Sequence, residues 1–355
     1  MSKLFSPLKL RGVEFKNRVF VSPMCQYSSE DGLPTDWHLV HLGSRAVGGA
    51  GMVMVEASAV SPEGRISPWD SGIWSEDHAR AFERVTDFIS RQGAVPGIQL
   101  SHAGRKASTR RPWDGGGPYS GEEGWVPSAP SAVPFAEGWH EPRELTGQDL
   151  EKLVADFRRA ARLSLEAGFR VVEVHMAHGY LLHEFLSPLS NRREDEYGGS
   201  RENRMRLPLR VAEAVREEWP GELPVFVRVS ATDWVEGGWE LEDTIELARH
   251  LRELGVDLVD CSSGGNVPDA DIPVKKDYQT TFAAEIRRQT GVATGAVGLI
   301  TEARHSEEIV SEGRADAVLL ARELLRDPYW PLHAAHALGE DPEWPPQYQR
   351  AKPRS

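Results

Sequence analysis

The sequence predicts an α/β protein built as a single (β/α)8 TIM barrel. Eight short runs rich in β-branched residues recur along the 355-residue chain, at 18–22, 51–57, 95–100, 170–175, 224–230, 257–261, 292–297 and 316–321. Stretches of helical periodicity lie between most of them, and this alternation is typical of a parallel sheet. The first run leads into SPMCQYSS without the glycine-rich turn of an open dinucleotide-binding sheet, so a closed barrel is favoured.

Six helices are predicted from the spacing of apolar residues, and the clearest begins at Thr146. Thr146 and Asp149 form the pattern of a capping box, and Gly168 is suited to end the helix. Between them the apolar positions follow the i, i+3, i+4, i+7 rule, at Leu150, Leu153, Val154 and Phe157. The other predicted helices are 76–92, 201–218, 241–254, 280–290 and 302–312.

A long connection interrupts the alternation after the third strand. Residues 101–145 contain six prolines, the run Gly115–Gly117 and three tryptophans, at 113, 125 and 139. Loops of this length inside a compact domain are usually functional, so we expect a cap over the carboxyl-terminal face of the barrel. The alternative is a tolerated surface insertion. The whole chain, 1–355, is expected to form one domain, with 340–355 as a C-terminal tail.

Composition narrows the class of protein. The chain has 41 Lys and Arg against 54 Asp and Glu, a formal net charge of −13, which disfavours general nucleic-acid binding. No apolar run approaches the length of a membrane span. Cys25 and Cys261 are the only cysteines, too few for a disulfide framework. We therefore expect a soluble, cytoplasmic protein.

The candidate site lies where barrel strands end, because active sites of such barrels are built there. His175 and His178 follow the fourth strand at a spacing of three, and Tyr180 comes two residues later. One interpretation is a metal site that also includes His183 and Glu184, as in a metal-dependent hydrolase. The other is a pair of N–H donors that bind a substrate oxygen, with the tyrosine as proton donor.

Other strand ends favour anion binding and carbonyl activation. GAVG (295–298) and Arg322 follow the last two strands, where such barrels often bind phosphate, although the glycines also suit a tight turn. Asp233 is the only acid of note expected near the site. Lys106 is interpreted as a Schiff-base amine or an anion ligand. The Cys25 thiol is interpreted as a small buried hydrophobe or a nucleophile.

Eight segments spread over residues 3–350 are distinctive: SPMCQYSS, VEASAV, GIQLSHAGRK, VHMAHGYLLHEFLSPLSNRREDEYGGSRENR, FVRVSATD, DLVDCSSG, ATGAVG and ARELLRDP. In these segments the sequence resembles the Old Yellow Enzyme family, in its thermophilic-like (xenobiotic reductase-like) branch of FMN-dependent ene-reductases. The resemblance implies a barrel that holds FMN non-covalently at its mouth. The cofactor-binding residues implied are Ser22, Pro23, Met24, Cys25, Ala57, Gln99, Arg228, Gly298, Ala321 and Arg322.

The resemblance also implies an activity, that of an NADPH dehydrogenase reducing the C=C bond of α,β-unsaturated carbonyl compounds. NADPH or NADH would supply hydride through flavin N5 in a ping-pong sequence, and no metal is implied. His175 and His178 would bind the carbonyl oxygen, Tyr180 would supply the proton, and Tyr27 would border the substrate. These enones and enals are the expected small-molecule partners.

Three further features bear on the resemblance. The segment PPQYQR implies that Arg350 reaches the active site of a neighbouring subunit, and hence a homodimer or homotetramer. Ala321 stands where the family usually has glycine, so a methyl group is expected to approach the phosphate. The cap carries additional residues, RPWDGGGPYSGEEGW, so the shape of the substrate pocket does not transfer from the family.

Overall fold

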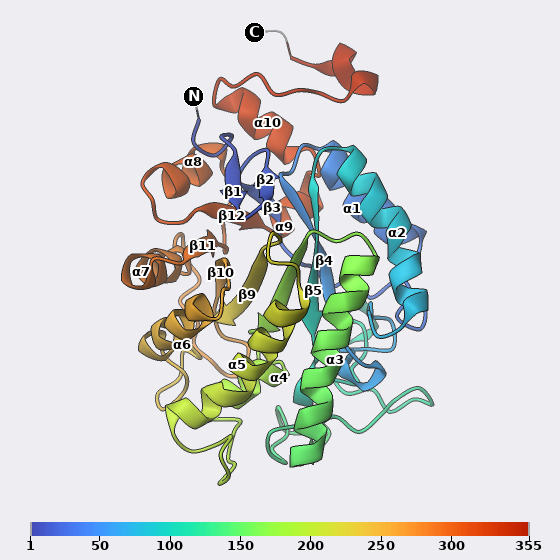
Figure 1. The fold of residues 1–355 in the computed structure, drawn as a ribbon, viewed down its shortest axis with the longest axis vertical. Helices are drawn as coiled ribbons and strands as arrows, with labels where there is room; N and C mark the ends of the chain where they lie inside the picture. Colours follow the sequence, from blue (N-terminus) through green and yellow to red (C-terminus); the bar gives the residue numbers. More distant parts are fainter. Residues whose placement is uncertain (1, 354–355) are drawn as a thin grey trace.

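The computed structural model describes residues 2–353, and eight parallel strands form a closed barrel at its centre (Figure 1). Neighbouring strands follow the order β10-β11-β12-β3-β4-β5-β8-β9, and β9 pairs with β10 to close the ring. Each predicted strand is present, which confirms the (β/α)8 barrel. The strands are β3 (Val19–Val21), β4 (Met52–Ala59), β5 (Val95–Ser101), β8 (Val171–Met176), β9 (Val225–Ser230), β10 (Leu258–Ser262), β11 (Ala293–Ala296) and β12 (Ala317–Leu320).

Helices surround the barrel, and all six predicted ones begin and end within three residues of the predicted limits. These six are α2 (Glu76–Arg91), α3 (Gly147–Glu166), α5 (Arg201–Glu218), α6 (Leu241–Glu253), α7 (Thr280–Thr290) and α8 (Ala303–Ser311). Residues 2–353 contain four further α-helices that were not predicted: α1 (Asp36–Val47), α4 (Leu181–Leu186), α9 (Arg322–Arg326) and α10 (Trp330–Ala337). No helix between residues 2 and 353 is both long enough and apolar enough to cross a membrane.

Helix α3 shows why the capping pattern and the spacing of apolar residues predict a helix reliably. The Asp149 amide donates to the Thr146 hydroxyl at 3.3 Å, and the Asp149 carboxylate accepts from the Thr146 amide at 2.8 Å, which completes the predicted capping box. Leu150, Leu153 and Phe157 are buried on the face that the periodicity selected. Both the start and the orientation of the helix are therefore encoded within a few residues.

Helix α1 was missed because its apolar residues do not lie on a single face. Trp37 and Val40 are exposed by 55% and 66%, whereas Leu42 and Ala46 are buried. Exposed apolar residues blur the helical period from which an amphipathic helix is recognised.

A small hairpin closes the amino-terminal end of the barrel. Strands β1 (Leu8–Leu10) and β2 (Val13–Phe15) pair antiparallel, and the Phe15 ring lies 4.8 Å from that of Phe20 and 6.4 Å from that of Phe226, between centroids. The C-terminal tail lies beyond α10 at this same end, the top of Figure 1. Side chains thus fill this end, which leaves the carboxyl-terminal end for the site.

The segment 101–145 lies at the opposite end of the molecule, where its loops appear in teal and green in Figure 1. It contains the 3-10 helices Gly104–Lys106 and Pro112–Asp114 and a short parallel pair, β6 (Ser128–Ala129) and β7 (Arg143–Glu144). Three residues of this segment, Ala103, Ala107 and Trp125, belong to one apolar cluster. The other members of the cluster come from other parts of the chain: Cys25, Tyr27, Ile66 and Tyr180. The excursion therefore lies over the mouth of the barrel.

Candidate active site

Three side chains converge at the carboxyl-terminal end of β8. His175 lies on the strand, His178 lies in the following turn, and Tyr180 immediately precedes α4. The centroid of the His175 ring lies 5.2 Å from that of His178 and 5.1 Å from that of Tyr180, and both pairs meet edge to face. The structure therefore brings together the three residues that the sequence singled out.

Neighbouring strands hold His178 in a strained conformation. Its φ of +61° lies in the left-handed region, which a non-glycine residue adopts only when its surroundings impose it. The backbone amide of His178 donates to the Ser230 hydroxyl on β9 at 2.9 Å, and ring atom Nε2 lies 2.6 Å from the Ser262 hydroxyl on β10. These contacts set the direction of the imidazole.

The three rings are neutral groups that can donate hydrogen bonds. Burial, and then the nearby Arg228 cation, lower the pKa values of His175 and His178 well below the usual histidine value. Burial raises the pKa of the Tyr180 phenol well above its usual value. At neutral pH each imidazole therefore carries one N–H and the phenol keeps its O–H.

Lys106 connects three loops at the mouth of the barrel. Its Nζ atom donates to the carbonyl oxygens of His178 at 2.8 Å and Gly265 at 3.0 Å, and it lies 5.2 Å from the centroid of the Tyr180 ring and 4.7 Å from that of Phe135. Burial lowers the pKa of this amine to about 8. Because carbonyl groups and ring faces already surround the ammonium, it serves to position the loops rather than to bind an anion.

Two polar pairs cross the interior of the barrel just below these rings. The Gln99 amide donates to Glu173 Oε1 at 2.8 Å, and Arg228 Nε lies 3.0 Å from Asp260 Oδ2. All four side chains are buried. The expectation that Asp233 is the only acid of note near the site is therefore wrong, since Glu173 and Asp260 belong to this end of the barrel.

Both of these interior acids have raised pKa values and therefore lose their protons less readily than an exposed carboxyl group. Burial and the charge of Asp260 raise the pKa of Glu173 to about 8, and burial also raises the pKa of Asp260. Glu173 therefore retains its proton at pH 7. Because Glu173 is neutral at this pH, the Asp260 carboxyl is the interior acid that pairs with the Arg228 cation.

The end of β3 supplies a second wall of the site. Ser22 is buried, Pro23, Met24, Cys25 and Tyr27 are partly buried, and Ala57 on β4 lies in register with Gln99 on β5. Burial, with Asp70 and Glu56 nearby, raises the pKa of the Cys25 thiol well above its usual value. The thiol is therefore protonated at neutral pH, which argues against a thiolate nucleophile.

A cavity of about 300 Å³ lies at the ends of β11 and β12. Gly298, Ala321 and Arg322 line it together with His178, so the predicted phosphate region and one of the two histidines share one hollow. Gly298 has a φ of +106°, and a Cβ there would lie 2.6 Å from Gln279 Nε2, so glycine is required. Ala321 has a φ of −106°, so alanine fits here without left-handed strain.

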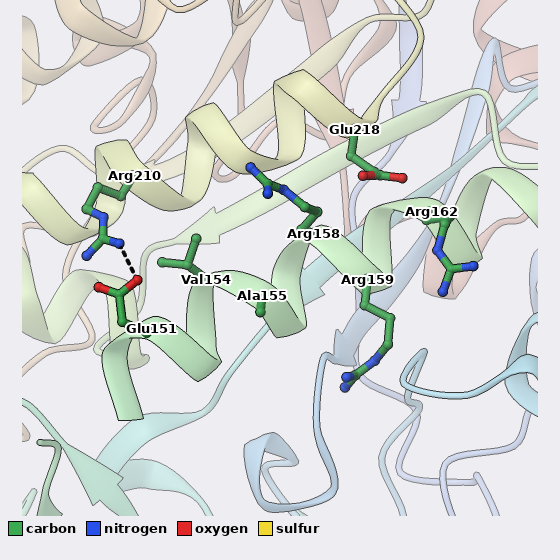
Figure 2. A pocket seen from close by; sticks show the side chains of 8 residues that line it. All are labelled: Glu151, Val154, Ala155, Arg158, Arg159, Arg162, Arg210 and Glu218. Atoms are coloured by element: carbon green, nitrogen blue, oxygen red, sulfur yellow. Dashed lines mark hydrogen bonds and ion pairs between the residues drawn. The ribbon is translucent and has the colours of Figure 1, made fainter. Parts of the chain in front are cut away.

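A second hollow, the groove between α3 and α5, carries four arginines but is unsuited to bind an anion (Figure 2). Each guanidinium already has a carboxylate partner: Arg158 pairs with Glu217, Arg159 with Asp156, Arg162 with Glu166 and Arg210 with Glu151. By contrast, within residues 2–353 the Arg322 side chain makes no hydrogen bond or ion pair. The unpaired cation thus lies at the barrel mouth.

Comparison with known proteins identifies the family. Residues 3–341 match the profile described as the NADH:flavin oxidoreductase / NADH oxidase family. The chain belongs to this family. Over 353 residues it is 50% identical to the NADPH dehydrogenase of Listeria innocua, a match that covers 99% of each chain.

Solved structures agree with this family. The old yellow enzyme homologue from Zymomonas mobilis superposes with a TM-score of 0.81 at 26% identity, covering 99% of this chain and 100% of the other. A 2-naphthoyl-CoA reductase gives a TM-score of 0.85 at 25% identity over 95% of this chain, which spans only 52% of that reductase. The resemblance to the Old Yellow Enzyme family is thus confirmed. As a member of the flavin oxidoreductase family the protein is an oxidoreductase that uses FMN and NAD(P)H.

The residues at the barrel mouth fit a flavin of this family. Within the described residues, buried polar atoms there lack hydrogen-bond partners, namely Ser22 Oγ, Glu173 Oε2 and His175 Nδ1. Buried polar groups are normally satisfied, so these atoms indicate a polar ligand. Together with the unpaired Arg322 cation beside Gly298, they offer partners for a polar ring at one end and a phosphate at the other.

The metal-dependent hydrolase is not supported. His183 Nε2 lies 3.1 Å from Asp233 Oδ1, and Glu184 Oε1 accepts from the Arg105 amide, so neither side chain joins the histidine pair. Residues 2–353 contain no group of three His, Cys, Asp or Glu side chains placed to hold a metal ion. Membership in a flavin oxidoreductase family also disfavours this alternative.

Arg350 lies away from these groups. It belongs to the exposed 3-10 helix Pro346–Ala351 in the C-terminal tail. In Figure 1 this tail is at the top of the molecule, beyond α10, whereas the segment 101–145 over the barrel mouth is at the bottom. The arginine therefore lies at the end of the barrel opposite to the site in its own chain.

Proposed function

We propose that the protein is an ene-reductase, which uses FMN and NADPH or NADH to reduce the C=C bond of α,β-unsaturated carbonyl compounds. The observation that carries the proposal is the convergence of His175, His178 and Tyr180 at the end of β8, beside an apolar cluster. Reduction of an enone requires hydrogen-bond donors for the carbonyl oxygen and a proton donor for the α-carbon. The two neutral imidazoles offer the first, and the protonated phenol offers the second.

The residues that would hold FMN surround this trio. Ser22, Pro23, Met24, Cys25 and Ala57 would line the flavin, with Gln99 and Arg228 at its pyrimidine side and Gly298, Ala321 and Arg322 at its phosphate. When bound, the flavin accepts hydride from the nicotinamide and passes hydride to an electron-poor alkene. The Arg228 cation suits this place, because a fixed positive charge stabilises a neighbouring group that gains electrons.

The two histidines would bind and polarise the substrate carbonyl. Each is neutral and offers one N–H, so both can donate to the same oxygen. This oxygen gains negative charge as hydride adds to the β-carbon, and preorganised donors stabilise that charge most strongly in a buried site. His178 is fixed by Ser230 and Ser262, which reduces the cost of orienting it during the reaction.

Tyr180 would supply the proton to the α-carbon. Its raised pKa keeps the proton on the Oη atom at every physiological pH, as an acid requires. The Lys106 ammonium faces the Tyr180 ring at 5.2 Å and stabilises negative charge that remains on the phenolate after transfer. The apolar cluster of Tyr27, Ile66 and Trp125 would exclude water from the reacting atoms.

We further propose that the protein is a homodimer or homotetramer in which Arg350 reaches the site of a neighbour. Its position at the far end of its own barrel supports a contribution in trans rather than in cis. Arg350→Ala is expected to raise the KM for the alkene without changing the rate of flavin reduction by NADPH. Native mass spectrometry tests the assembly, and a strictly monomeric, fully active protein would contradict this proposal.

An anaerobic stopped-flow experiment on the FMN-loaded protein tests the main function. NADPH is expected to bleach the flavin absorbance, and 2-cyclohexenone is then expected to restore it, with parallel initial-rate lines in the steady state. A protein that takes up no FMN, or whose reduced flavin does not respond to an enone, would overturn the ene-reductase assignment.

A further inference from the structure

One part of the cap carries a tryptophan to the rim of the site. Residues 108–119, which we name the cap hairpin, double back so that the amide of Arg110 donates to the carbonyl of Gly117 at 2.9 Å. Trp113 is at the tip, in the 3-10 helix Pro112–Asp114. Because backbone hydrogen bonds close the hairpin, its tip is held in place rather than hanging as an open loop.

Three glycines set the path of this hairpin. Gly115, Gly116 and Gly117 have φ values of +95°, +61° and +72°, all in the left-handed region. A Cβ at any of them would meet nothing within 4 Å, so close packing does not explain glycine here. The run is required for the turn itself, which returns the chain immediately after Trp113.

Trp113 contacts the wall of the proposed substrate site through a single ring. Its centroid lies 5.8 Å from that of Tyr27, with the ring planes at 86°. Tyr27 in turn packs in the apolar cluster that includes Cys25 and Tyr180. The indole therefore extends the wall formed by Tyr27 outwards by one ring.

Arg111 holds this indole in place. Its guanidinium carbon lies 5.4 Å from the Trp113 ring centroid and 4.4 Å from that of Trp69, and Nε lies 2.6 Å from Asp114 Oδ2. Cation–π contacts of this kind orient an aromatic ring even near solvent. Nevertheless Trp113 remains 62% exposed, so the protein orders a large apolar surface without covering it.

We propose that Trp113 is a specificity-determining residue that selects alkenes bearing a flat aromatic group at a distance from the reacting C=C bond. This inference rests on the proposed ene-reductase function. Aromatic rings prefer edge-to-face or offset contacts, and a planar group placed beside Tyr27 would find the exposed indole positioned for one. A small cyclic enone would not extend to the rim of the site, so the Trp113 indole would not contribute to its binding.

The test compares a long aryl enone with a small one. Steady-state kcat and KM are measured at saturating NADPH for 6-phenyl-3-hexen-2-one, whose phenyl ring is two methylene groups away from the C=C bond, and for 2-cyclohexenone. Trp113→Ala is expected to raise the KM for the aryl enone about three- to tenfold, the equivalent of one lost aromatic contact, with kcat nearly unchanged. The KM for 2-cyclohexenone should change less than about twofold.

Further variants distinguish the effect of the aromatic ring at position 113 from the effect of side-chain volume. Trp113→Phe should retain most of the preference, whereas Trp113→Leu, which keeps an apolar side chain without a ring, should lose it. Val40→Ala trims an apolar side chain of similar exposure, 66%, on α1, and should leave both KM values unchanged. Bound FMN and the far-UV circular dichroism spectrum confirm that each variant is folded.

The outcomes distinguish this inference from the function on which it rests. A wild-type protein that does not reduce 2-cyclohexenone would contradict the ene-reductase function itself. If it does reduce 2-cyclohexenone but Trp113→Ala changes both KM values equally, or neither, the selective role is wrong. A change confined to the KM for NADPH or to the rate of flavin bleaching would assign the indole to the nucleotide and also overturn the inference.

Discussion

The Nζ atom of Lys106 donates a 2.8 Å hydrogen bond to the backbone carbonyl oxygen of His178. This contact joins the loop after β5 to the turn after β8, and it restrains the one histidine of the pair whose backbone is in the left-handed region. A charged donor makes a stronger hydrogen bond than a neutral one. The geometry of the proposed carbonyl site therefore depends on the protonation of a lysine that does not touch the substrate carbonyl.

Activity should consequently fall as pH rises through about 8, the pKa to which burial lowers Lys106. Below this pH the ammonium holds the His178 carbonyl, and above it the amine is neutral and the contact weakens. We expect kcat/KM for 2-cyclohexenone to fall about tenfold between pH 7 and 10, corresponding to a weakened charge-assisted bond. The measurement is a pH profile of the alkene half-reaction.

Variants of Lys106 show which group titrates. Lys106→Met should have low activity without the inflection near pH 8, while Lys106→Arg should shift the inflection upwards. Burial also raises the pKa of the neighbouring Glu184 to about 8. An inflection that persists in Lys106→Met would therefore assign the titration to Glu184 instead.

Replacement of Tyr180 should separate the two half-reactions. In Tyr180→Phe the phenolic proton is lost but the ring remains against His175, so bleaching by NADPH should be unchanged. The enone step should slow about a hundredfold, the usual effect of losing a general acid. Stopped-flow traces of each step measure this. Tyr119→Phe, which alters a tyrosine of the cap, is the matched control, and equal slowing of both steps in Tyr180→Phe would point to a structural role.

Glu173 should make the folded protein less stable as pH rises. Its pKa is about 8 in the folded state against an ordinary value of 4.5, so between these values the folded chain keeps a proton that the unfolded chain has lost. The unfolded state then binds fewer protons, and the free energy of unfolding falls with pH by up to about 1.4 kcal/mol per unit. Glu173→Gln keeps a partner for Gln99 and should flatten this slope.

Urea unfolding of wild type and Glu173→Gln at several pH values between 5 and 8 measures the difference. Glu122→Gln, at an exposed position in the cap, is the control and should follow the wild type. Parallel stability curves for wild type and Glu173→Gln would show that Glu173 is ionised in the folded protein.

The barrel could be predicted because its signals are local. Strands and helices alternate in short segments, and caps such as Thr146 with Asp149 lie within one turn. The same local logic could have found the interior acids. Glu173 lies two residues before His175, and Asp260 two before Ser262, so each pair lies on one face of its strand. Both acids lie before the strand ends, so a prediction from strand-end residues alone does not include them.

The function of Lys106 could not be predicted from the sequence, because its partners are distant in the chain. His178 lies 72 residues away and Gly265 lies 159 residues away, and both contacts use backbone carbonyls, which leave no mark in the sequence. The contact of Trp113 with Tyr27 is of the same kind, since it joins the cap to the end of β3. Such contacts depend on closure of the barrel, which only the folded chain provides.

Loss of the α3 cap should cost stability rather than activity. The Thr146 hydroxyl accepts from the Asp149 amide, and an alanine at this position leaves that donor without its partner. Thr146→Ala is expected to lower the free energy of unfolding by about 1 kcal/mol, with kcat unchanged because the helix end is remote from His175. Thr281→Ala, an exposed threonine within α7, is the matched control and should not destabilise.

The acidic member of the same capping box adds a pH dependence of opposite sign to that of Glu173. Hydrogen bonds from Arg143 and Thr146 hold the pKa of Asp149 well below its usual range. Its stabilising contribution is therefore present above the ordinary aspartate pKa, near 3.8, and is lost as pH falls below it. The stability difference between wild type and Asp149→Asn should narrow between pH 5 and 3 in urea unfolding. A difference that stays constant over this range would show that the carboxylate charge contributes nothing to the cap.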